Sequence, residues 1–357
     1  MGGGDETGKA MKRGTRGARL RARGRASRER GTAPRVPHPS PLAEQLTAIE
    51  RSGRDGVLSF EDGRTLRVSS LDKVYFPRDG ITKGDVMRYY VAVAPVLLPI
   101  IADRPLGLKR YPQGIEGQPF FQQNATKYPR GVRVERIRTE AGTRAPRFVG
   151  GDLPTLLYLV QLGTIALHTW QSRVGSLDDA DYSTIDLDPG EGVRFARVVE
   201  IARMFRERIA DEGLRAAVKT SGSRGIHIAI PLPPGTSFAA STRLAGRLAE
   251  GIVRDRPELA TLERHIENRP KGTIYLDVQQ NARGKSVVSA YSVRARRGAT
   301  VSAPLRWTEV TGRLRLDRFT VRTMPRRLTR VGDVWGDVLR AGNRTTSRKD
   351  SDAGGRA

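Results

Sequence analysis

Three aspartates stand on two segments whose alternation of apolar and polar residues is typical of half-buried strands. In residues 184–188 (TIDLD), the two-residue period places Asp186 and Asp188 on one face of a strand. Asp277 sits in a second segment with the same alternation. Three convergent carboxylates are the usual protein part of a two-metal phosphoryl-transfer site, in which substrate phosphates supply the other oxygen ligands. The alternatives are a solvated strand edge for the pair and an arginine ion pair for Asp277.

A loop with two glycines divides residues 218–230 into two segments of strand-like sequence. The glycines let the backbone turn amide groups toward an anion, and Ser221, Arg224 and Lys219 add hydroxyl and cationic donors, as a triphosphate requires. His227 lies on the face opposite the neighbouring isoleucines, so it can face a site. An ordinary Gly/Ser hairpin turn is the alternative interpretation.

Two lysines flank a turn that precedes a predicted helix. Lys73 and Lys83 bracket this turn, and Thr82 is suited to cap the helix expected over residues 85–101. A helix N-terminus beside two lysines favours phosphate binding. The alternative is that both lysines are simply solvated.

Two further features suit a nucleic-acid site. Phe120 and Phe121 follow a segment rich in proline and glycine, and paired aromatic residues in a loop can stack on bases. Burial in the core is the usual alternative for such residues. Arg294 can add a phosphate contact, although it is one arginine among many.

The composition favours a polyanionic partner. The 357 residues include 63 Lys and Arg against 38 Asp and Glu, a formal net charge of +25, which points first to nucleic acid. The chain has no cysteine, which excludes disulfides, cysteine-ligated metal centres and thiol nucleophiles. Its four histidines argue against a multi-histidine metal site. Any catalytic metal must therefore rely on carboxylates.

The sequence contains no expected membrane span. Its most apolar run, residues 91–101, is interrupted by two prolines and is much shorter than the roughly 20 residues that a membrane helix needs. The N-terminus has no apolar stretch after its basic residues, which argues against a secretory signal. We therefore expect a cytoplasmic, nucleoid-associated protein with no membrane partner.

Three regions are expected along the chain: a disordered basic arm over residues 1–40, a catalytic domain over residues 41–325 and a basic, flexible tail over residues 326–357. The first 36 residues hold 11 Lys and Arg against 3 acidic residues and almost no large apolar residue, so burial cannot offset their ordering entropy.

The folded part mixes helices and strands. Apolar spacing predicts helices over residues 85–101, 156–167 and 193–212, the first bent or stopped at its prolines. Alternation predicts strands near residues 55–69, 183–188, 215–231, 273–279 and 287–294.

Taken in order, these segments closely resemble the polymerase domain of bacterial ligase D, a branch of the archaeo-eukaryotic primase superfamily that acts in non-homologous end joining. The resemblance runs from about Val57 to Val310. The matching motifs are LDKVYFP at 71–77, ITKGD at 81–85, RPL at 104–106, RYPQG at 110–114, FFQ at 120–122, LHTW at 167–170, SR at 172–173, DLDP at 186–189, KTSG at 219–222, GIH at 225–227, LD at 276–277, QN at 280–281 and YSVR at 291–294.

The resemblance implies an α+β fold, with an archaeo-eukaryotic primase-like core whose RRM-like antiparallel sheet bears the acids, and an N-terminal α/β module. It implies that Asp186, Asp188 and Asp277 are catalytic and bind two divalent cations, Mn²⁺ or Mg²⁺. The implied nucleotide-binding residues, for an NTP or dNTP substrate, are His168, Ser221, Arg224, His227 and Arg294. Lys73 and Lys83 match lysines that bind a DNA 5′-phosphate, and Phe120 and Phe121 match aromatics that stack on a base.

The implied function is DNA-end processing by a gap-filling nucleotidyltransferase that prefers ribonucleotides. Its expected partners are gapped or broken DNA with a 5′-phosphate, together with Ku and a separate DNA ligase, because no ligase motif is visible in this chain. A primase that starts chains de novo and a non-catalytic DNA-end-binding protein are the alternatives. Two departures from the family concern DNA or template affinity: Gln122-Gln123 where a lysine is common, and Ser223-Arg224 where Gly-Lys is common.

Overall fold

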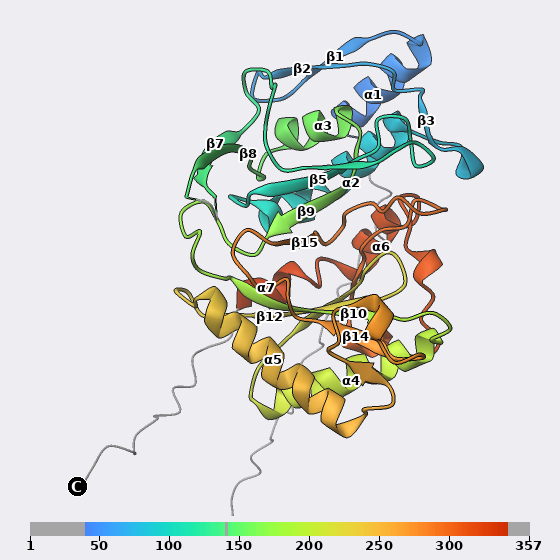
Figure 1. The fold of residues 1–357 in the computed structure, drawn as a ribbon. Coiled ribbons are helices and arrows are strands. Elements are labelled where there is room, and N and C mark those ends of the chain that lie inside the picture. Colours follow the sequence, from blue (N-terminus) through green and yellow to red (C-terminus); the bar gives the residue numbers. More distant parts are fainter. Residues whose placement is uncertain (1–39, 140–141, 342–357) are drawn as a thin grey trace, which may run out of the picture. The chain divides into compact units, whose positions relative to one another are not determined.

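Two β-sheets form the centre of the computed structural model, which describes residues 40–139 and 142–341. The larger sheet has the strand order β13 (Ala260–Thr261), β14 (Ile274–Asp277), β10 (Tyr182–Pro189), β12 (Ile226–Pro231), β11 (Ala217–Thr220) and β16 (Pro304–Leu305). The smaller sheet has the order β15 (Ser286–Val288), β9 (Thr164–Trp170), β5 (Leu106–Arg110) and β6 (Phe120–Gln122). In Figure 1 the smaller sheet lies above the larger one, and its edge strand β15 is on the side toward the larger sheet.

Strand β10 holds the acid-bearing sheet together. Ile185 and Leu187 are fully buried, whereas Asp186 and Asp188, which alternate with them along the strand, are only half-buried. This is the alternation that the sequence predicts. β10 pairs antiparallel with both β12 and β14. The short β13–β14 pair is parallel, and the other pairs of this sheet among the described residues are antiparallel. The prediction of an antiparallel sheet bearing the acids is confirmed.

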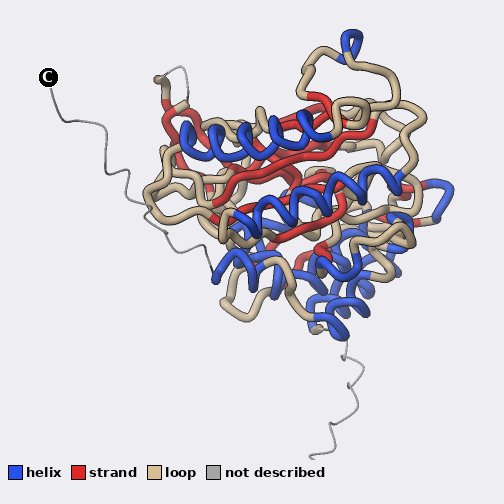
Figure 2. Tube along the Cα trace, turned by 90° about the horizontal axis from the view of Figure 1, so that it is seen from below, coloured by secondary structure: helices blue, strands red, loops and turns tan. Residues whose placement is uncertain are grey.

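Two amphipathic helices cover the outer face of the larger sheet. α4 (Phe195–Asp211) packs on β10 and β12, and α5 (Phe238–Asp255) packs on β10 and on α4. Both lie below the sheet in Figure 1, and the view from below shows long helices across the strands (Figure 2). Because the helices take the apolar face of β10, its carboxylates are left on the opposite face, toward the smaller sheet. α4 matches the helix predicted over residues 193–212, whereas α5 was not predicted.

The N-terminal part adds helices and hairpins around the smaller sheet. Its helices are α1 (Pro41–Ser52), α2 (Lys83–Ile101) and α3 (Leu153–Gln161), and α2 packs against both α1 and α3. Its hairpins are β1–β2 (Gly56–Ser59, Thr65–Val68), β3–β4 (Val74–Phe76, Ile81–Thr82) and β7–β8 (Val134–Arg138, Arg144–Phe148). The β3–β4 hairpin leads directly into α2, which starts with a capping box of Thr82 and Asp85.

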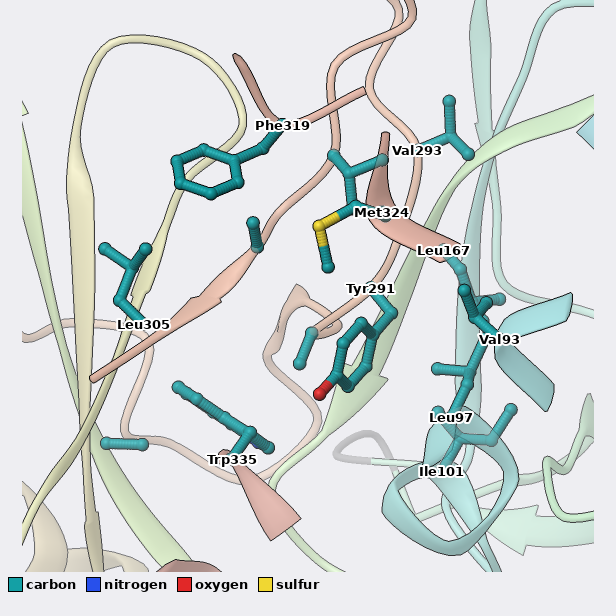
Figure 3. Close-up of a cluster of buried hydrophobic side chains, with 14 of the residues drawn as sticks. Val93, Leu97, Ile101, Leu167, Tyr291, Val293, Leu305, Phe319, Met324 and Trp335 are labelled. Atoms are coloured by element: carbon teal, nitrogen blue, oxygen red, sulfur yellow. The ribbon is translucent and has the colours of Figure 1, made fainter. Parts of the chain in front are cut away.

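Helix α2 continues through both of its prolines, so the stop that was one of the two expected outcomes does not occur. Pro95 and Pro99 lie on its exposed side, while Val93, Leu97 and Ile101 are buried on the other (Figure 3). Burial of that apolar side offsets the loss of hydrogen bonds at the prolines. α2 is also the described helix that is long and apolar enough to cross a membrane, with 56% of its most apolar window buried inside the fold. Core helices pass this test equally, so it is weak evidence for a span.

The flexible tail expected from residue 326 is not found in the described part of that range. Residues 324–341 contain α6 (Met324–Val331) and α7 (Gly336–Ala341). Met324 and Trp335 are buried in the cluster shown in Figure 3, next to Tyr291. The apolar residues of this segment are few and widely spaced among arginines, which is why its local composition resembled a tail. The remainder of the predicted tail and the basic arm up to residue 39 lie outside the described residues.

Two other predicted elements differ from the structure. The helix expected over residues 156–167 ends at Gln161, because Gly163 takes a left-handed conformation (φ +85°) and β9 begins at Thr164. The strand expected over residues 287–294 is limited to β15, after which the chain forms turns. Both differences leave the acid-bearing strands unaffected.

Candidate active site

Two of the predicted acids face each other directly across adjacent strands. Asp186 of β10 is paired in register with Asp277 of β14. Asp188 lies two residues further along β10, so it is on the same face of the sheet. On the other side of β10, His227 of β12 is the register partner of Asp186. The fold therefore brings three carboxylates and one imidazole to one surface.

A cavity of about 340 Å³ opens on this surface. Strand β15 of the smaller sheet contributes Ser286, Val287 and Val288 to its wall, so the cavity lies between the two sheets. The eight residues predicted to be catalytic or nucleotide-binding all line it: Asp186, Asp188, Asp277, His168, Ser221, Arg224, His227 and Arg294. The structure thus brings the predicted group together, while the roles of its members stay predictions.

The three aspartates form the acidic wall of the cavity, and their negative charges repel one another. Burial, together with the neighbouring carboxylates of Asp277 and Asp188, raises the pKa of Asp186 to about 7. Asp188 has a cationic neighbour, since Nη1 of Arg269 lies 3.6 Å from its Oδ2. The Arg269 guanidinium also stacks on Tyr275, 3.9 Å from the ring centre. Additional positive charge near Asp186 would therefore stabilise its ionised form.

The donor set fits a divalent cation that substrate phosphates help to hold. Among residues 40–139 and 142–341, no group of three or more His, Asp or Glu side chains is gathered closely enough to hold a metal ion alone. Asp186, Asp188 and Asp277 nevertheless line one cavity and offer only oxygen ligands, which hard cations prefer. A cation that takes further ligands from a triphosphate needs few from the protein.

The glycine-containing loop is shaped by close contacts at both glycines. Gly222 has φ +69°, and a Cβ there would lie 2.6 Å from Cγ of Arg294. A Cβ at Gly225 would overlap the carbonyl oxygen of Leu187. Inside the loop, Ser221 Oγ accepts hydrogen bonds from the backbone N–H groups of Ser223 (3.1 Å) and Gly225 (3.0 Å).

This geometry changes how the loop can bind an anion. The N–H groups of Ser223 and Gly225 are used by Ser221 itself, whereas amide groups directed at an anion were expected. With its two lone pairs engaged, the Ser221 hydroxyl keeps its own proton to donate. Nη1 of Arg294 donates to the Ser221 carbonyl at 2.5 Å, which fixes the guanidinium beside the hydroxyl. Arg224 is exposed at the cavity.

Lys219 is not a direct donor at this cavity, contrary to the sequence-based expectation. It is 2% exposed and lies behind His227, with Nζ 2.9 Å from His227 Nδ1. The other ring nitrogen, Nε2, is 3.3 Å from Oδ1 of Asp186. Alternation along β11 and the register of Lys219 with His227 explain this placement. This placement could not be predicted, because the strand ends at Thr220 and local sequence does not show whether Lys219 belongs to the strand or to the loop.

His168 and the paired phenylalanines form the upper side of the site. His168 lies on β9 beside β15, and burial together with the charges of Arg294 and Lys219 lowers its pKa to about 3, so the ring is neutral. Phe121 meets His168 edge-on, with ring centres 5.5 Å apart. Phe120 and Phe121 are 46% and 47% exposed, which favours the base-stacking interpretation over core burial.

The two predicted phosphate-binding lysines lie together at the start of α2. The backbone N–H of Lys83 donates to the carbonyl of Lys73 at 2.8 Å. Lys73 Nζ donates to Gln113 Oε1 at 2.6 Å. Lys83 is only 4% exposed, and burial and the charge of Lys73 lower its pKa to about 8. Neither lysine lines the acidic cavity, so this is a separate candidate site.

Several residues of the site were not anticipated. Ser286 and Arg296 line the cavity, and Arg269 reaches Asp188 from a loop. Their sequence context offered no local sign, because single polar residues in loops are common throughout this basic chain. Of the departures from the family pattern, Gln123 accepts a hydrogen bond from Arg147 at 2.6 Å, so it is engaged within the fold.

Comparisons with known proteins agree on one family. The family model described as "LigD, primase-polymerase domain" matches residues 82–335. A multifunctional non-homologous end joining protein LigD from Mycolicibacterium smegmatis is 34% identical over 248 residues, covering 69% of this chain and 32% of the relative. The bifunctional LigD of Bacillus subtilis is 33% identical over 276 residues, covering 77% of this chain and 44% of the relative. The chain therefore spans about a third to less than half of these relatives.

Solved structures give the same result at the level of the fold. The polymerase domain from Mycobacterium tuberculosis ligase D, in complex with DNA, matches with a TM-score of 0.72 and 32% sequence identity. The match covers 78% of this chain and 99% of that domain. The similarity thus extends over nearly the whole solved domain.

Proposed function

The chain belongs to the LigD primase-polymerase family, and from this premise we propose that it is a DNA-directed nucleotidyltransferase that fills gaps and extends broken ends in non-homologous end joining. The observation that carries the proposal is the convergence of eight predicted residues on one cavity. Carboxylates together with cationic and hydroxyl donors around one cavity suit a triphosphate held for attack by a primer hydroxyl. DNA is the proposed partner, and Ku and a separate ligase are further proposed partners.

The residues that line the cavity have two proposed roles, metal binding and phosphate binding. Asp186, Asp188 and Asp277 would hold two Mn²⁺ or Mg²⁺ ions, which when bound supply activation of the primer hydroxyl and charge stabilisation on the leaving pyrophosphate. Arg294 and Ser221 line the same cavity and are placed to donate to phosphate oxygens.

The neutral His168 and the exposed Phe121 suit the sugar and base rather than the phosphates. The two rings are in edge-on contact, and each has an apolar surface against which a nucleoside can lie. The Arg110 guanidinium packs on the ring of Phe120, 4.9 Å from the ring centre. Both phenylalanines are thereby supported in positions that leave nearly half of each side chain open to a base.

An extension assay tests the proposed function. The purified protein is incubated with Mn²⁺ and either ribonucleotides or deoxyribonucleotides on three DNAs: a 5′-phosphorylated gap, the same gap without phosphate, and an unprimed template. We expect extension that is greatest on the phosphorylated gap and with ribonucleotides. Products on the unprimed template would support a primase instead. DNA binding without incorporation on any of the three would leave a DNA-end-binding protein.

The lysine pair makes 5′-phosphate recognition depend on pH. A terminal phosphate is a dianion above about pH 7, whereas the pKa of Lys83 is lowered to about 8. Above that pH the amine is increasingly neutral, so we expect the affinity advantage of a phosphorylated over an unphosphorylated gap to fall about tenfold between pH 7 and pH 9. Fluorescence anisotropy with the two DNAs measures this ratio.

Two variants of Lys83 test the same assignment. Lys83→Arg keeps its charge across this range, so its ratio should stay constant with pH. Lys83→Met should lose the phosphate advantage at every pH. It should also be more heat-stable than the wild type at pH 7, because the folded-state pKa lies below the unfolded value and burying the ammonium costs stability below about pH 8. A constant ratio in the wild-type protein would contradict the assignment.

A further inference from the structure

The buried Lys219 has no place in the direct contacts proposed above, yet it is joined to the site by a short chain of polar contacts. Its Nζ lies 2.9 Å from His227 Nδ1 and 2.7 Å from Ser302 Oγ. The Trp335 ring centre is 5.7 Å from the same nitrogen. We propose that Lys219 is a positioning residue that fixes the tautomer of His227, so that Nε2–H is presented to the nucleotide in the cavity. This inference rests on the proposed nucleotide site.

The direction of each hydrogen bond follows from its neighbours. Ser302 Oγ donates its only proton to the carbonyl of Thr220, 2.8 Å away, so it can only accept from Lys219. Lys219 is therefore a donor in this network. As an ammonium, Lys219 has three N–H groups and no lone pair, so in its contact with His227 Nδ1 the ring nitrogen accepts and carries no proton. In a neutral imidazole the proton must consequently be on Nε2.

The opposite side of the ring leads to the same assignment. Nε2 of His227 lies 3.3 Å from Asp186 Oδ1. When Asp186 is ionised, its oxygen is an acceptor, so an unprotonated Nε2 would place two lone pairs against each other. With the proton on Nε2, the ring donates toward the acidic wall and toward any phosphate oxygen in the cavity. Both neighbours of His227 thus select one of its two tautomers.

Burial at a position that is 2% exposed lowers the pKa of Lys219 well below its usual range, and the nearby Asp186 carboxylate acts against this shift in favour of the ammonium. The Trp335 ring faces it at a distance suited to a cation–π interaction. A small cavity of about 10 Å³ beside it is also lined by the hydroxyl-bearing Thr184 and Ser289. Trp335 comes from the C-terminal segment, so this segment supports the proposed nucleotide site from behind.

A spectroscopic measurement reads the tautomer directly in the wild-type protein. The chain has four histidines, so ¹⁵N-histidine labelling gives few ring signals, and His227 is assigned by its loss in His227→Ala. We expect the ¹⁵N shifts of His227 to show a protonated Nε2 and an unprotonated Nδ1. In Lys219→Met, which removes the donor at similar size, we expect a mixture of tautomers. A wild-type ring protonated on Nδ1 would overturn the proposal.

A double-mutant cycle on nucleotide binding separates positioning from general structure. Lys219→Met should weaken binding of a labelled ribonucleoside triphosphate by about three- to tenfold, because only a fraction of the rings then carries the proton on Nε2. In a His227→Ala background it should change binding less than about twofold, since Lys219 acts through that ring. The exposed Lys271→Met is the matched control and should bind like the wild type.

The outcomes separate the two proposals. Equal losses from Lys219→Met with and without His227 would overturn the positioning role, because Lys219 would then act independently of the ring. A wild-type protein that binds no nucleotide would contradict the proposed function. The ¹⁵N shifts would still decide the positioning claim in that case.

Discussion

Asp186→Asn is expected to reduce nucleotide incorporation at a 5′-phosphorylated gap by at least about 10³-fold, the range seen when a central catalytic group is removed. Asp186 stands in the middle of the proposed site, between Asp277 on one strand and His227 on the other. The substitution keeps the size of the side chain and removes its charge. DNA binding should change less than about threefold, because the lysine pair lies outside this cavity. Single-nucleotide incorporation and anisotropy measure the two effects.

The same variant should not be unstable. In the wild type, burial and two neighbouring carboxylates raise the pKa of Asp186 to about 7, so its ionised form is disfavoured in the folded protein. Asn removes that cost, and we expect a melting temperature in metal-free buffer at or above that of the wild type. Mn²⁺ should raise the melting temperature of the wild type more than that of the variant.

A charge-matched control completes this comparison. Asp211→Asn removes one carboxylate from the exposed end of α4, away from the cavity. It should incorporate nucleotides at the wild-type rate. Loss of incorporation in Asp186→Asn together with a lower melting temperature would instead indicate a structural role for Asp186.

Arg294→Gln is expected to raise the KM for the nucleotide by about 10- to 100-fold, as expected when a charge-assisted contact to a phosphate is lost. The guanidinium lines the cavity and is held by the carbonyl of Ser221 at 2.5 Å. Burial lowers its pKa, yet an arginine remains charged at neutral pH. Its charge therefore faces a triphosphate with little competing solvent. Steady-state kinetics at saturating DNA measure the effect.

Two further arginine variants show whether the increase in KM is specific to Arg294. Arg297→Gln removes an exposed arginine three residues away, which does not line the cavity, and its KM should equal that of the wild type. Arg294→Lys keeps a charge but loses the forked contact geometry, so its KM should lie between those of the wild type and Arg294→Gln. Similar KM increases for Arg297→Gln and Arg294→Gln would show that the basic surface as a whole, and not Arg294, binds the nucleotide.

The parts of the fold that could be predicted are those whose local pattern matches their final burial. The alternation around Asp186 and the apolar spacing of residues 193–212 are local patterns, and β10 and α4 follow them. Helix α2 and the segment around Trp335 depend on distant partners instead. Neither the burial that carries α2 through Pro95 nor the cluster that receives Trp335 is visible in local sequence. α5 was missed although Ser237 caps it and its apolar spacing is helical.

The candidate site shows the same division. The chemistry and spacing of the acids, glycines and His227 marked them as candidates, and the family resemblance grouped them into one site. The placement of Lys219 behind His227 depends on the register of two strands, which composition does not specify. Arg269 reaches Asp188 from a separate loop, and among many arginines no sequence feature distinguishes it. Residue types thus pointed to a candidate site, and only tertiary packing showed which of its residues line the cavity and which lie behind it.

The central claim is that Asp186, Asp188 and Asp277 hold divalent cations at the cavity where nucleotides are joined. Anomalous diffraction from crystals grown with Mn²⁺, a gapped DNA and a non-hydrolysable nucleotide tests it most directly. The account predicts Mn²⁺ within coordinating distance of all three carboxylates and of the triphosphate. A bound nucleotide whose Mn²⁺ contacts none of these aspartates would contradict it.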